Sequence, residues 1–515
     1  MSISHFTEKT FSYFLLSAVT LSTIAQIPPP FPVKRTESAE TWRRDGWNAL
    51  EQAKKLKVRS GKAKNVILFV GDGMGVSTLT AARIFEGQQN GESGEENRLS
   101  FEQFPYSALS KTYSVNQQTS DSAPTMSAII SGVKTDEGII SVDQNVRHGD
   151  YKTVAGNETK TLLEYAEGAG KSTGVISTAR LTHATPAACY AHSAARDWES
   201  DADIASRRKD AHDAKFPDIA RQLIEFPYGD GLEVALGGGR TKFLPTTIKD
   251  PEYPTRTGER LDGRDLTEEW RKKYKSSAYV WNKQQFDAVD AKNTKHLFGL
   301  FEPSHMKYEH DRLKDTAGEP SLTAMTTKAI DVLASNKKGY FLMVEAGRID
   351  HAHHDGNAYR ALKDTVALSD AVRAAAAKVN LDETLIIVTA DHSHTFFIQG
   401  YPSRGNNILG LVREVGPDGE IEQGYALDSN KKPFTTLGYA NGPGARGSER
   451  PTLAGDAVLN PDYKQEANIP MLAETHAGED VPIFAIGVNA HLIRGSMEQN
   501  WIFYVMADAM RLGRK

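Results

Sequence analysis

Residues 65–75 read NVILFVGDGMG, a short apolar run that stops at an aspartate flanked by glycines. Runs of the same kind recur along the chain: STGVIST (172–178), LEVALG (232–237), GYFLMVE (339–345), TLIIVT (384–389) and VPIFAIG (481–487). Helical periodicity occupies the intervals between them, notably 158–169, 321–335 and 358–379. Because buried strands alternate with helices, the sequence predicts an α/β fold with a large, mostly parallel sheet covered by helices on both faces.

The remaining segments divide the chain around this sheet. The apolar run FSYFLLSAVTLSTIA (11–25) ends in small residues and predicts a signal peptide over 1–25, with a short N-terminal anchor as the alternative. A proline-rich linker (26–37) and an amphipathic helix (38–56) follow it. Residues 400–470 are rich in Gly, Pro and Asn, which indicates an inserted small subdomain. Residues 57–399 and 471–515 are then predicted to form the main α/β domain.

The composition narrows the class of protein. Hydrophobic residues are 39% and charged residues 25% of the 515 residues, as in a folded protein with a core. A net charge of −5 gives no support to a nucleic-acid-binding module. Cys189 is the only cysteine, so an intramolecular disulfide is impossible; this alone would suggest a reducing compartment. The signal segment instead predicts a periplasmic or secreted protein, and no other run or C-terminal tail predicts a membrane anchor in the mature chain.

Acidic residues and histidines gather next to the predicted strands. In open α/β sheets, functional sites form beyond the carboxyl ends of strands. The segments there contain Asp72; His183 and Thr185; Glu345, Asp350, His351, His353, His354 and Asp355; and Asp391, His392 and His394; while His476 lies just before the last strand. Taken singly, each could cap a turn or lie in a solvated loop. Together they supply the imidazole and carboxylate ligands that metals require, so the sequence predicts a metal cluster.

The ligand types and their spacing suggest which metals bind. Asp350 and His354 are four residues apart, so a helical turn would place both on one face. Histidines mixed with carboxylates suit Zn²⁺, whereas carboxylates, a hydroxyl and waters suit Mg²⁺. Ser122, within TSDSAPTMSAIISGVKT (119–135), lacks the G-x-S-x-G elbow of serine hydrolases. It is either a helix cap or a nucleophile that something other than histidine activates.

Long stretches of the chain match a known family. They are NVILFVGDGMGVSTLTAARI (65–84), SDSAPTMSAIISGVKTDEG (120–138), THATPAACYAHSAARDW (182–198), LFEPSHMKYE (300–309), VEAGRIDHAHHDGNAYRAL (344–362), VTADHSHTF (388–396) and ETHAGED (474–480). In these stretches the chain resembles the alkaline phosphatases, especially the animal-type branch. With the predicted signal peptide, this suggests a secreted bacterial member of that branch. The resemblance implies hydrolysis of phosphate monoesters to an alcohol and inorganic phosphate at alkaline pH.

The resemblance also implies a role for each matched residue. One zinc ion would bind Asp350, His354 and His476; a second would bind Asp72, Asp391, His392 and the Ser122 hydroxyl; and magnesium would bind Asp72, Thr185 and Glu345. The implied catalytic residues are Ser122, Arg196, His183 and His351, and His394 would support the ligands of the first zinc. Ser122 would form a phosphoserine while Arg196 holds two phosphate oxygens. Asp121 is not a matched ligand, and we expect it to orient Arg196 or nearby backbone.

The sequence departs from the family in several places. Thr185 stands where the animal branch has serine, which keeps an oxygen ligand, and Pro124 falls in the first turn of the predicted helix, where proline is tolerated. A family calcium site matches Glu252, the Phe301 carbonyl, Glu302 and Glu319, with Glu319 in place of the usual aspartate. The alternative is that these are surface acids. The family's dimers further imply a homodimer that uses 38–56 and 400–470.

Two other interpretations stay open at this point. A sulfatase or phosphodiesterase could share the sheet and the zinc sites, but SDSAPTM lacks the arginine of the sulfatase C/S-x-P-x-R signature. A diesterase would need room for a second ester substituent, which a sequence does not show. A metal-binding or phosphate-sequestering protein that is no longer an enzyme should have lost a ligand or the nucleophile, and every expected one is present.

Overall fold

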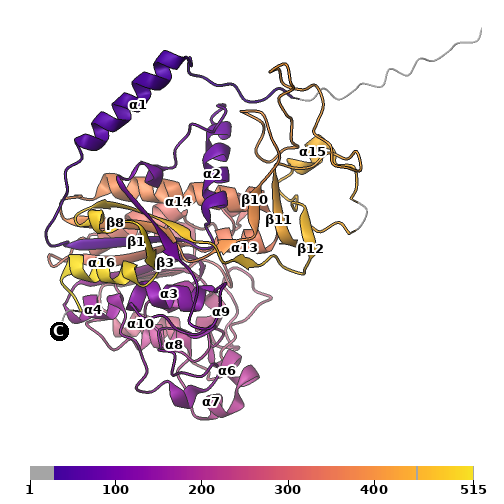
Figure 1. Cartoon of the computed structure of the whole chain (residues 1–515). Helices are drawn as coiled ribbons and strands as arrows, with labels where there is room; N and C mark the ends of the chain where they lie inside the picture. Colours follow the sequence, from indigo (N-terminus) through magenta and orange to yellow (C-terminus); the bar gives the residue numbers. More distant parts are fainter. Residues whose placement is uncertain (1–27, 448–449, 514–515) are drawn as a thin grey trace, which may run out of the picture.

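A large mixed sheet forms the centre of the molecule (Figure 1). The computed structural model describes residues 28–447 and 450–513, so the predicted signal peptide lies outside the described residues. The sheet has ten strands in the order β15-β2-β14-β8-β1-β7-β3-β4-β6-β5. The six predicted runs are confirmed as β1 (Asn65–Gly71), β3 (Ser172–Arg180), β4 (Val234–Gly238), β7 (Tyr340–Ala346), β8 (Thr384–Ala390) and β14 (Val481–Gly487).

The remaining strands lie toward the two edges of the sheet and were not predicted. They are β2 (Tyr106–Lys111), β5 (Ser277–Val280), β6 (His296–Leu300) and β15 (Ser496–Glu498). β2, β5 and β15 are short and partly exposed, so they lack the continuous apolar run of a central strand. β14 runs antiparallel to both β8 and β2, whereas β1 is parallel to β7 and β8. The sheet is therefore mostly but not wholly parallel.

Helices cover both faces of the sheet, as predicted (Figure 1). Side chains of β1 alternate between the two cores: Val66, Leu68 and Val70 face one, and Ile67 and Phe69 the other. One core is completed by helices that include α3 (Ser122–Ser131), α4 (Leu162–Gly168), α8 (Ile219–Ile224), α10 (Leu266–Lys273) and α16 (Trp501–Met510); the other by α2 (Val76–Gln89), α12 (Leu322–Leu333) and α14 (Ala358–Lys378).

The predicted helices at 321–335 and 358–379 are confirmed as α12 and α14. The helix predicted over 158–169 begins only at Leu162, so its predicted start was wrong. Thr161 is its N-cap: its side chain accepts from the Glu164 N–H, and the Glu164 carboxylate accepts from the Thr161 N–H. This capping box fixes where the chain enters the helix.

A second, three-stranded sheet combines two strands of the Gly- and Pro-rich part of the chain (400–470) with one strand that lies just before it. Its strands are β10 (Phe396–Ile398), β11 (Leu437–Gly442) and β12 (Ala467–Pro470), and the short helix α15 (Gly455–Val458) lies beside them (Figure 1). A two-stranded ribbon of β9 (Ser393–His394) and β13 (His476–Ala477) lies where this region joins the large sheet. The small sheet thus begins two residues after His394.

Helix α1 (Ala39–Lys54) extends away from the body of the molecule (Figure 1). Ser38 and Thr41 form a capping box at its start. None of its residues is buried, and the Trp42 and Trp47 side chains are 53% and 65% exposed. Within residues 28–447 and 450–513, no helix is long and apolar enough to cross a membrane. α1 is amphipathic, and no apolar surface among the described residues covers it.

Candidate active site

The predicted ligands converge because of the order and direction of the strands. β8, β1, β7 and β3 are neighbours and run parallel, so the segments after them reach one edge of the sheet. Asp391 follows β8, Asp72 follows β1, and Glu345 lies near the end of β7. β14 runs the opposite way, and for this reason His476, which precedes it, reaches the same edge.

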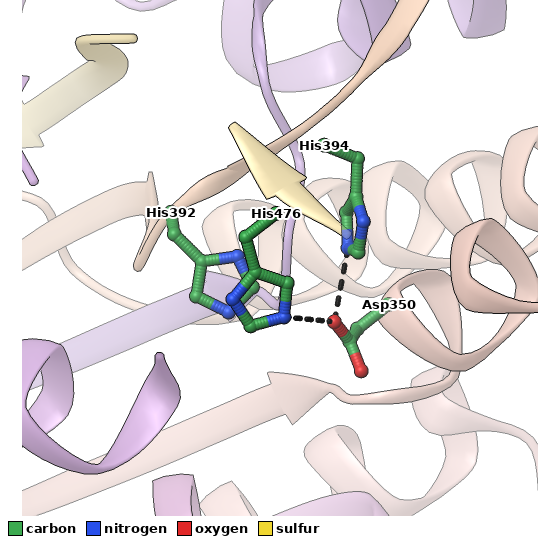
Figure 2. Close-up of side chains that lie close together, drawn as sticks. All are labelled: Asp350, His392, His394 and His476. Carbon is green, nitrogen blue, oxygen red and sulfur yellow. Dashed lines mark hydrogen bonds and ion pairs between the residues drawn. The ribbon is translucent and has the colours of Figure 1, made fainter. Parts of the chain in front are cut away.

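An imidazole-rich group surrounds the Asp350 carboxylate (Figure 2). Asp350 Oδ1 lies 2.9 Å from His394 Nε2, 3.2 Å from His354 Nε2 and 3.4 Å from His476 Nε2. Helix α13 (Arg348–His354) places Asp350 and His354 one turn apart, as their spacing predicted. His476 and His394 are paired between β13 and β9, and His476 Nδ1 lies 2.9 Å from the Ser120 carbonyl. Residues from four segments thus share one small volume.

Glu474 belongs to this group, although the sequence analysis did not single it out. Its Oε2 lies 2.6 Å from His394 Nδ1, and its Oε1 accepts from Thr395 N at 2.6 Å. Burial acts to lower the pKa of His394, but the Glu474 and Asp350 carboxylates raise it to about 10. His394 therefore links two carboxylates. The only sequence signal for Glu474 was its position two residues before His476.

A second group lies around His392 Nε2. This atom is 3.2 Å from Ser122 Oγ, 3.3 Å from Asp72 Oδ1 and 3.4 Å from Asp391 Oδ2. The other Asp391 oxygen, Oδ1, accepts hydrogen bonds from the backbone N–H groups of Gly73 and His392, both at 3.0 Å. All four side chains are buried. One hydroxyl, one imidazole and two carboxylates therefore point at a common centre.

A third group consists of oxygen donors around Asp72 and Glu345. Glu345 Oε2 accepts a hydrogen bond from Ser177 Oγ, which holds the carboxylate in place. Glu345 Oε1, Thr185 Oγ1 and both Asp72 oxygens are buried and have no hydrogen-bond partner among the described residues. Ligand atoms of Asp72, His183 and Glu345 lie within 4.8 Å of one another. Buried polar atoms are normally hydrogen-bonded, so this cradle fits a hard cation.

The electrostatics of the site support the same conclusion. Burial, together with the neighbouring Asp391, Asp350 and Glu345 carboxylates, raises the pKa of Asp72 well above its ordinary value. Burial also raises the pKa of Glu345 to about 7. Charged groups are buried at low cost only when they are paired or bind metals. The donor set of this site therefore fits divalent cations.

Ser122 is the first residue of α3, and Asp121 is its N-cap. The Asp121 side chain makes no hydrogen bond to the helix N–H groups and instead forms an ion pair with Arg196 Nη1. Pro124 lies within the first turn, where its missing N–H removes no helical bond. Of the two alternatives for Ser122, a capping role is therefore wrong, and its hydroxyl faces His392.

The Arg196 guanidinium lies between Asp121 and His183. Its Nη2 is 3.1 Å from His183 Nε2, and the Arg196 backbone N–H donates to the Gly138 carbonyl at 2.8 Å. Burial acts to lower the pKa of Arg196, but the adjoining Asp121 carboxylate raises it above its ordinary value. The side chain thus stays charged and is fixed beside the start of α3.

Three histidines, His183, His351 and His305, pack together next to Arg196. The His351 ring lies 5.4 Å from the His183 ring and 4.0 Å from the ring of His305. Burial first, and then nearby positive groups, lower the pKa of His183 and His351 well below the ordinary value, so both are neutral near pH 7. His305 was not predicted. It follows β6, so the rule of inspecting strand ends would have found it had β6 been recognised.

The residues matched to a calcium site lie together at a separate place. Ligand atoms of Glu252, Glu302 and Asp315 lie within 4.8 Å of one another. Glu319 Oε1 accepts from the Lys307 N–H at 2.9 Å. Phe301 directly follows β6 and is buried. Asp315 was not predicted; both of its carboxylate oxygens are buried and have no hydrogen-bond partner among the described residues, and Lys307 Nζ lies 4.0 Å from its Oδ1.

Known proteins resemble this chain over nearly its whole length. A family model described as alkaline phosphatase matches residues 63–512. The tissue-nonspecific alkaline phosphatase isozymes of Felis catus and Homo sapiens are 42% and 41% identical over 512 residues, which is 98% of this chain and 93% of each relative.

Solved structures resemble the chain as well. Alkaline phosphatase from Thermus thermophilus has a TM-score of 0.61 at 23% identity, over 90% of this chain and 94% of that chain. Alkaline phosphatase from the Antarctic bacterium TAB5 has a TM-score of 0.59 at 21% identity, over 89% of this chain and 100% of that chain. At these identities the two structures show a shared fold.

Proposed function

Because this chain belongs to the alkaline phosphatase family, we propose that it hydrolyses phosphate monoesters through a phosphoserine formed on Ser122. The observation that carries the proposal is the position of the Ser122 hydroxyl. Ser122 Oγ is buried at the start of α3, 3.2 Å from His392 Nε2, in a group that also contains Asp72 and Asp391. A serine hydroxyl is a poor nucleophile unless a base or a metal activates it.

Divalent cations are the proposed activators. We assign one zinc ion to Asp350, His354 and His476, a second to Asp72, Asp391, His392 and Ser122 Oγ, and magnesium to Asp72, Thr185 and Glu345. Mixed imidazole and carboxylate donors favour zinc, and the unpartnered oxygens of Asp72, Thr185 and Glu345 favour magnesium. When bound, such ions lower the pKa of the serine hydroxyl and neutralise charge on the phosphoryl group.

The chain's own residues then perform two displacements. Ser122 Oγ attacks phosphorus, the bond from phosphorus to the ester oxygen breaks, and the leaving alcohol takes up a proton. Water next cleaves the phosphoserine, which restores the Ser122 hydroxyl and releases inorganic phosphate. Through both steps Arg196 binds two phosphoryl oxygens with its planar fork. The N-terminus of α3 adds backbone donors that favour negative charge.

The direct test is to trap the intermediate. The zinc- and magnesium-loaded protein should hydrolyse p-nitrophenyl phosphate, and quenching it with substrate in acid should leave a phosphate on Ser122 that peptide mass spectrometry locates. Turnover without phosphate on Ser122 would contradict the covalent route. Faster turnover of bis(p-nitrophenyl) phosphate than of the monoester would favour a diesterase instead.

Replacing Arg196 with alanine should weaken phosphate binding more than it slows turnover. The variant loses two charge-assisted hydrogen bonds, each of about 1.5–3 kcal/mol, so the inhibition constant for inorganic phosphate should rise by about 10²- to 10⁴-fold. Steady-state kinetics with p-nitrophenyl phosphate and phosphate would measure this. Arg207, which is 56% exposed and pairs with Asp197, supplies the control Arg207→Ala. Unchanged phosphate inhibition in Arg196→Ala would contradict the assigned role.

The acidic group that contains Glu252, Glu302 and Asp315 also supports a bound cation. We propose calcium there, held by Glu252, Glu302 and Glu319 with the Phe301 carbonyl, and by Asp315 as a further carboxylate. Burial and the neighbouring Glu302 and Asp315 carboxylates raise the pKa of Glu319 to about 9, a sign of excess negative charge. Lys307 Nζ, 2.9 Å from Glu302 Oε1, offsets only part of it.

We further propose that the protein is a periplasmic or secreted homodimer that acts on small phosphate monoesters. The support for dimerisation is α1, which buries none of its residues in its own chain. Isolated helices of this length are marginal in water, so a partner surface is needed to stabilise it. A second copy of the chain is the proposed partner for the Trp42 and Trp47 side chains, with the inserted subdomain (400–470) as the other predicted contact.

The proposed dimer should therefore dissociate in the double variant Trp42→Glu/Trp47→Glu. Buried interface tryptophans each contribute about 2 kcal/mol or more, so the dimer Kd should rise by about 10³-fold. Analytical ultracentrifugation over a range of protein concentrations would measure it. Leu313, which is 84% exposed and lies outside both predicted contacts, supplies the single-site control Leu313→Glu. An unmodified protein that stays monomeric at micromolar concentration would contradict the proposal.

A further inference from the structure

The small sheet β10–β11–β12 is joined to two of the three segments that carry histidines of the imidazole-rich group, those of His394 and His476. β10 starts two residues after His394, and β12 ends four residues before Glu474. β11 lies between them, antiparallel to β10 and parallel to β12. β11 thus pairs with both strands that connect to the segments of His394 and His476.

Asn441 on β11 is hydrogen-bonded to Thr475, the residue between Glu474 and His476. Its Nδ2 donates to Thr475 Oγ1 at 2.9 Å, and its Oδ1 accepts from the Thr475 N–H at 3.0 Å. Next to it, Gly442 has a φ of +136°, and a Cβ there would lie only 3.0 Å from Glu474 Cβ. Strand β11 therefore approaches this segment as closely as a residue without a side chain permits.

Tyr439, two residues earlier on β11, reaches α13 through His353. The Tyr439 hydroxyl lies 2.8 Å from His353 Nδ1, and His353 Nε2 lies 3.0 Å from Thr78 Oγ1 on α2. His353 is fully buried, and its ring centroid is 4.7 Å from that of His394. Each hydroxyl can donate or accept, so both ring nitrogens are satisfied and the ring is held in one orientation.

We propose that β11 of the inserted subdomain positions the imidazole-rich metal site: Asn441 holds the segment of His476, and Tyr439 holds α13 through His353. The inference rests on the proposed zinc site of Asp350, His354 and His476. Asn441 and Tyr439 are positioning residues, because neither touches a proposed metal ligand directly. Residues that orient metal ligands from outside the coordination sphere typically contribute 10- to 100-fold to metal affinity.

The experiment measures zinc release from the zinc- and magnesium-loaded protein to a chromogenic chelator. In Asn441→Ala and in Tyr439→Phe, one zinc ion should leave about 10- to 100-fold faster than in the unmodified protein, and the other at an unchanged rate. Turnover of p-nitrophenyl phosphate should fall at limiting zinc and recover at excess zinc. Recovery distinguishes a positioning role from loss of a reacting group.

Matched controls come from the same subdomain. Asn468 is exposed on the adjoining β12, and Tyr401 is 85% exposed, so Asn468→Ala and Tyr401→Phe should release zinc as the unmodified protein does. Tyr439→Phe keeps the packed ring and so decides the question even if Asn441→Ala does not fold. Zinc release at the unmodified rate in a folded Asn441→Ala or Tyr439→Phe variant overturns the positioning role and leaves the proposed function standing. An unmodified protein that neither binds zinc nor hydrolyses the ester overturns the proposed function with it.

Discussion

Replacing Ser122 with alanine should lower kcat for p-nitrophenyl phosphate by about 10³-fold or more while the protein keeps its zinc. The expected loss is this large because the proposed reaction passes through a covalent bond to Ser122 Oγ, and removing an enzyme's nucleophile typically costs several orders of magnitude. The metals should remain, since the carboxylates and imidazoles of Asp72, Asp391 and His392 are unchanged. Steady-state kinetics and elemental analysis of the same sample measure both quantities.

The helix that carries Ser122 offers its own control. Ser131 is the last residue of α3 and donates to the Ser127 carbonyl at 2.7 Å, far from the acids and histidines of the site. Ser131→Ala should keep kcat close to that of the unmodified protein. If Ser122→Ala turns over at the unmodified rate, the phosphoserine route is wrong.

Removing the cations with EDTA should abolish turnover and lower the melting temperature. Without them, the buried carboxylates of Asp72, Glu345, Asp350 and Asp391 lack their proposed counter-charge. A ligand present at about 1,000 times its Kd stabilises the folded state by about 4 kcal/mol, so its removal should destabilise the protein by a similar amount. Calorimetry before and after chelation would measure the change.

Add-back experiments identify which cations matter. Zinc with magnesium should restore both turnover and melting temperature, whereas magnesium alone should restore neither. Elemental analysis of the untreated protein should find two zinc ions and one magnesium ion per chain, with calcium as a further proposed ion. Full activity in metal-free buffer after exhaustive chelation would contradict the assignment of these residues.

Much of the fold could be predicted because buried parallel strands leave a plain pattern. The run at 65–70 and the five like it are confirmed as central strands of the sheet, and two helices were placed to within two residues. The sequence analysis missed β2, β5 and β15 because partial exposure removes the continuous apolar run, and it missed β6 (HLFGL), which is buried but has only five residues. Because β6 was missed, the strand-end rule could not be applied to His305, Glu302 and Asp315, which follow it.

The sequence by itself determined which donors are available: which segments end in acids and histidines, and that Ser122 lies at the start of a helix. Only the tertiary structure decided how they meet. The reversed direction of β14 brings His476 to the shared edge, where its ring lies 2.9 Å from the carbonyl of Ser120, 356 residues earlier. Likewise, the Asp121 side chain pairs with Arg196 and not with its own helix, and Tyr439 on β11 of the small sheet contacts His353. Periodicity records how each segment is buried, whereas contacts between distant segments depend on strand order and direction, which packing of the whole chain sets.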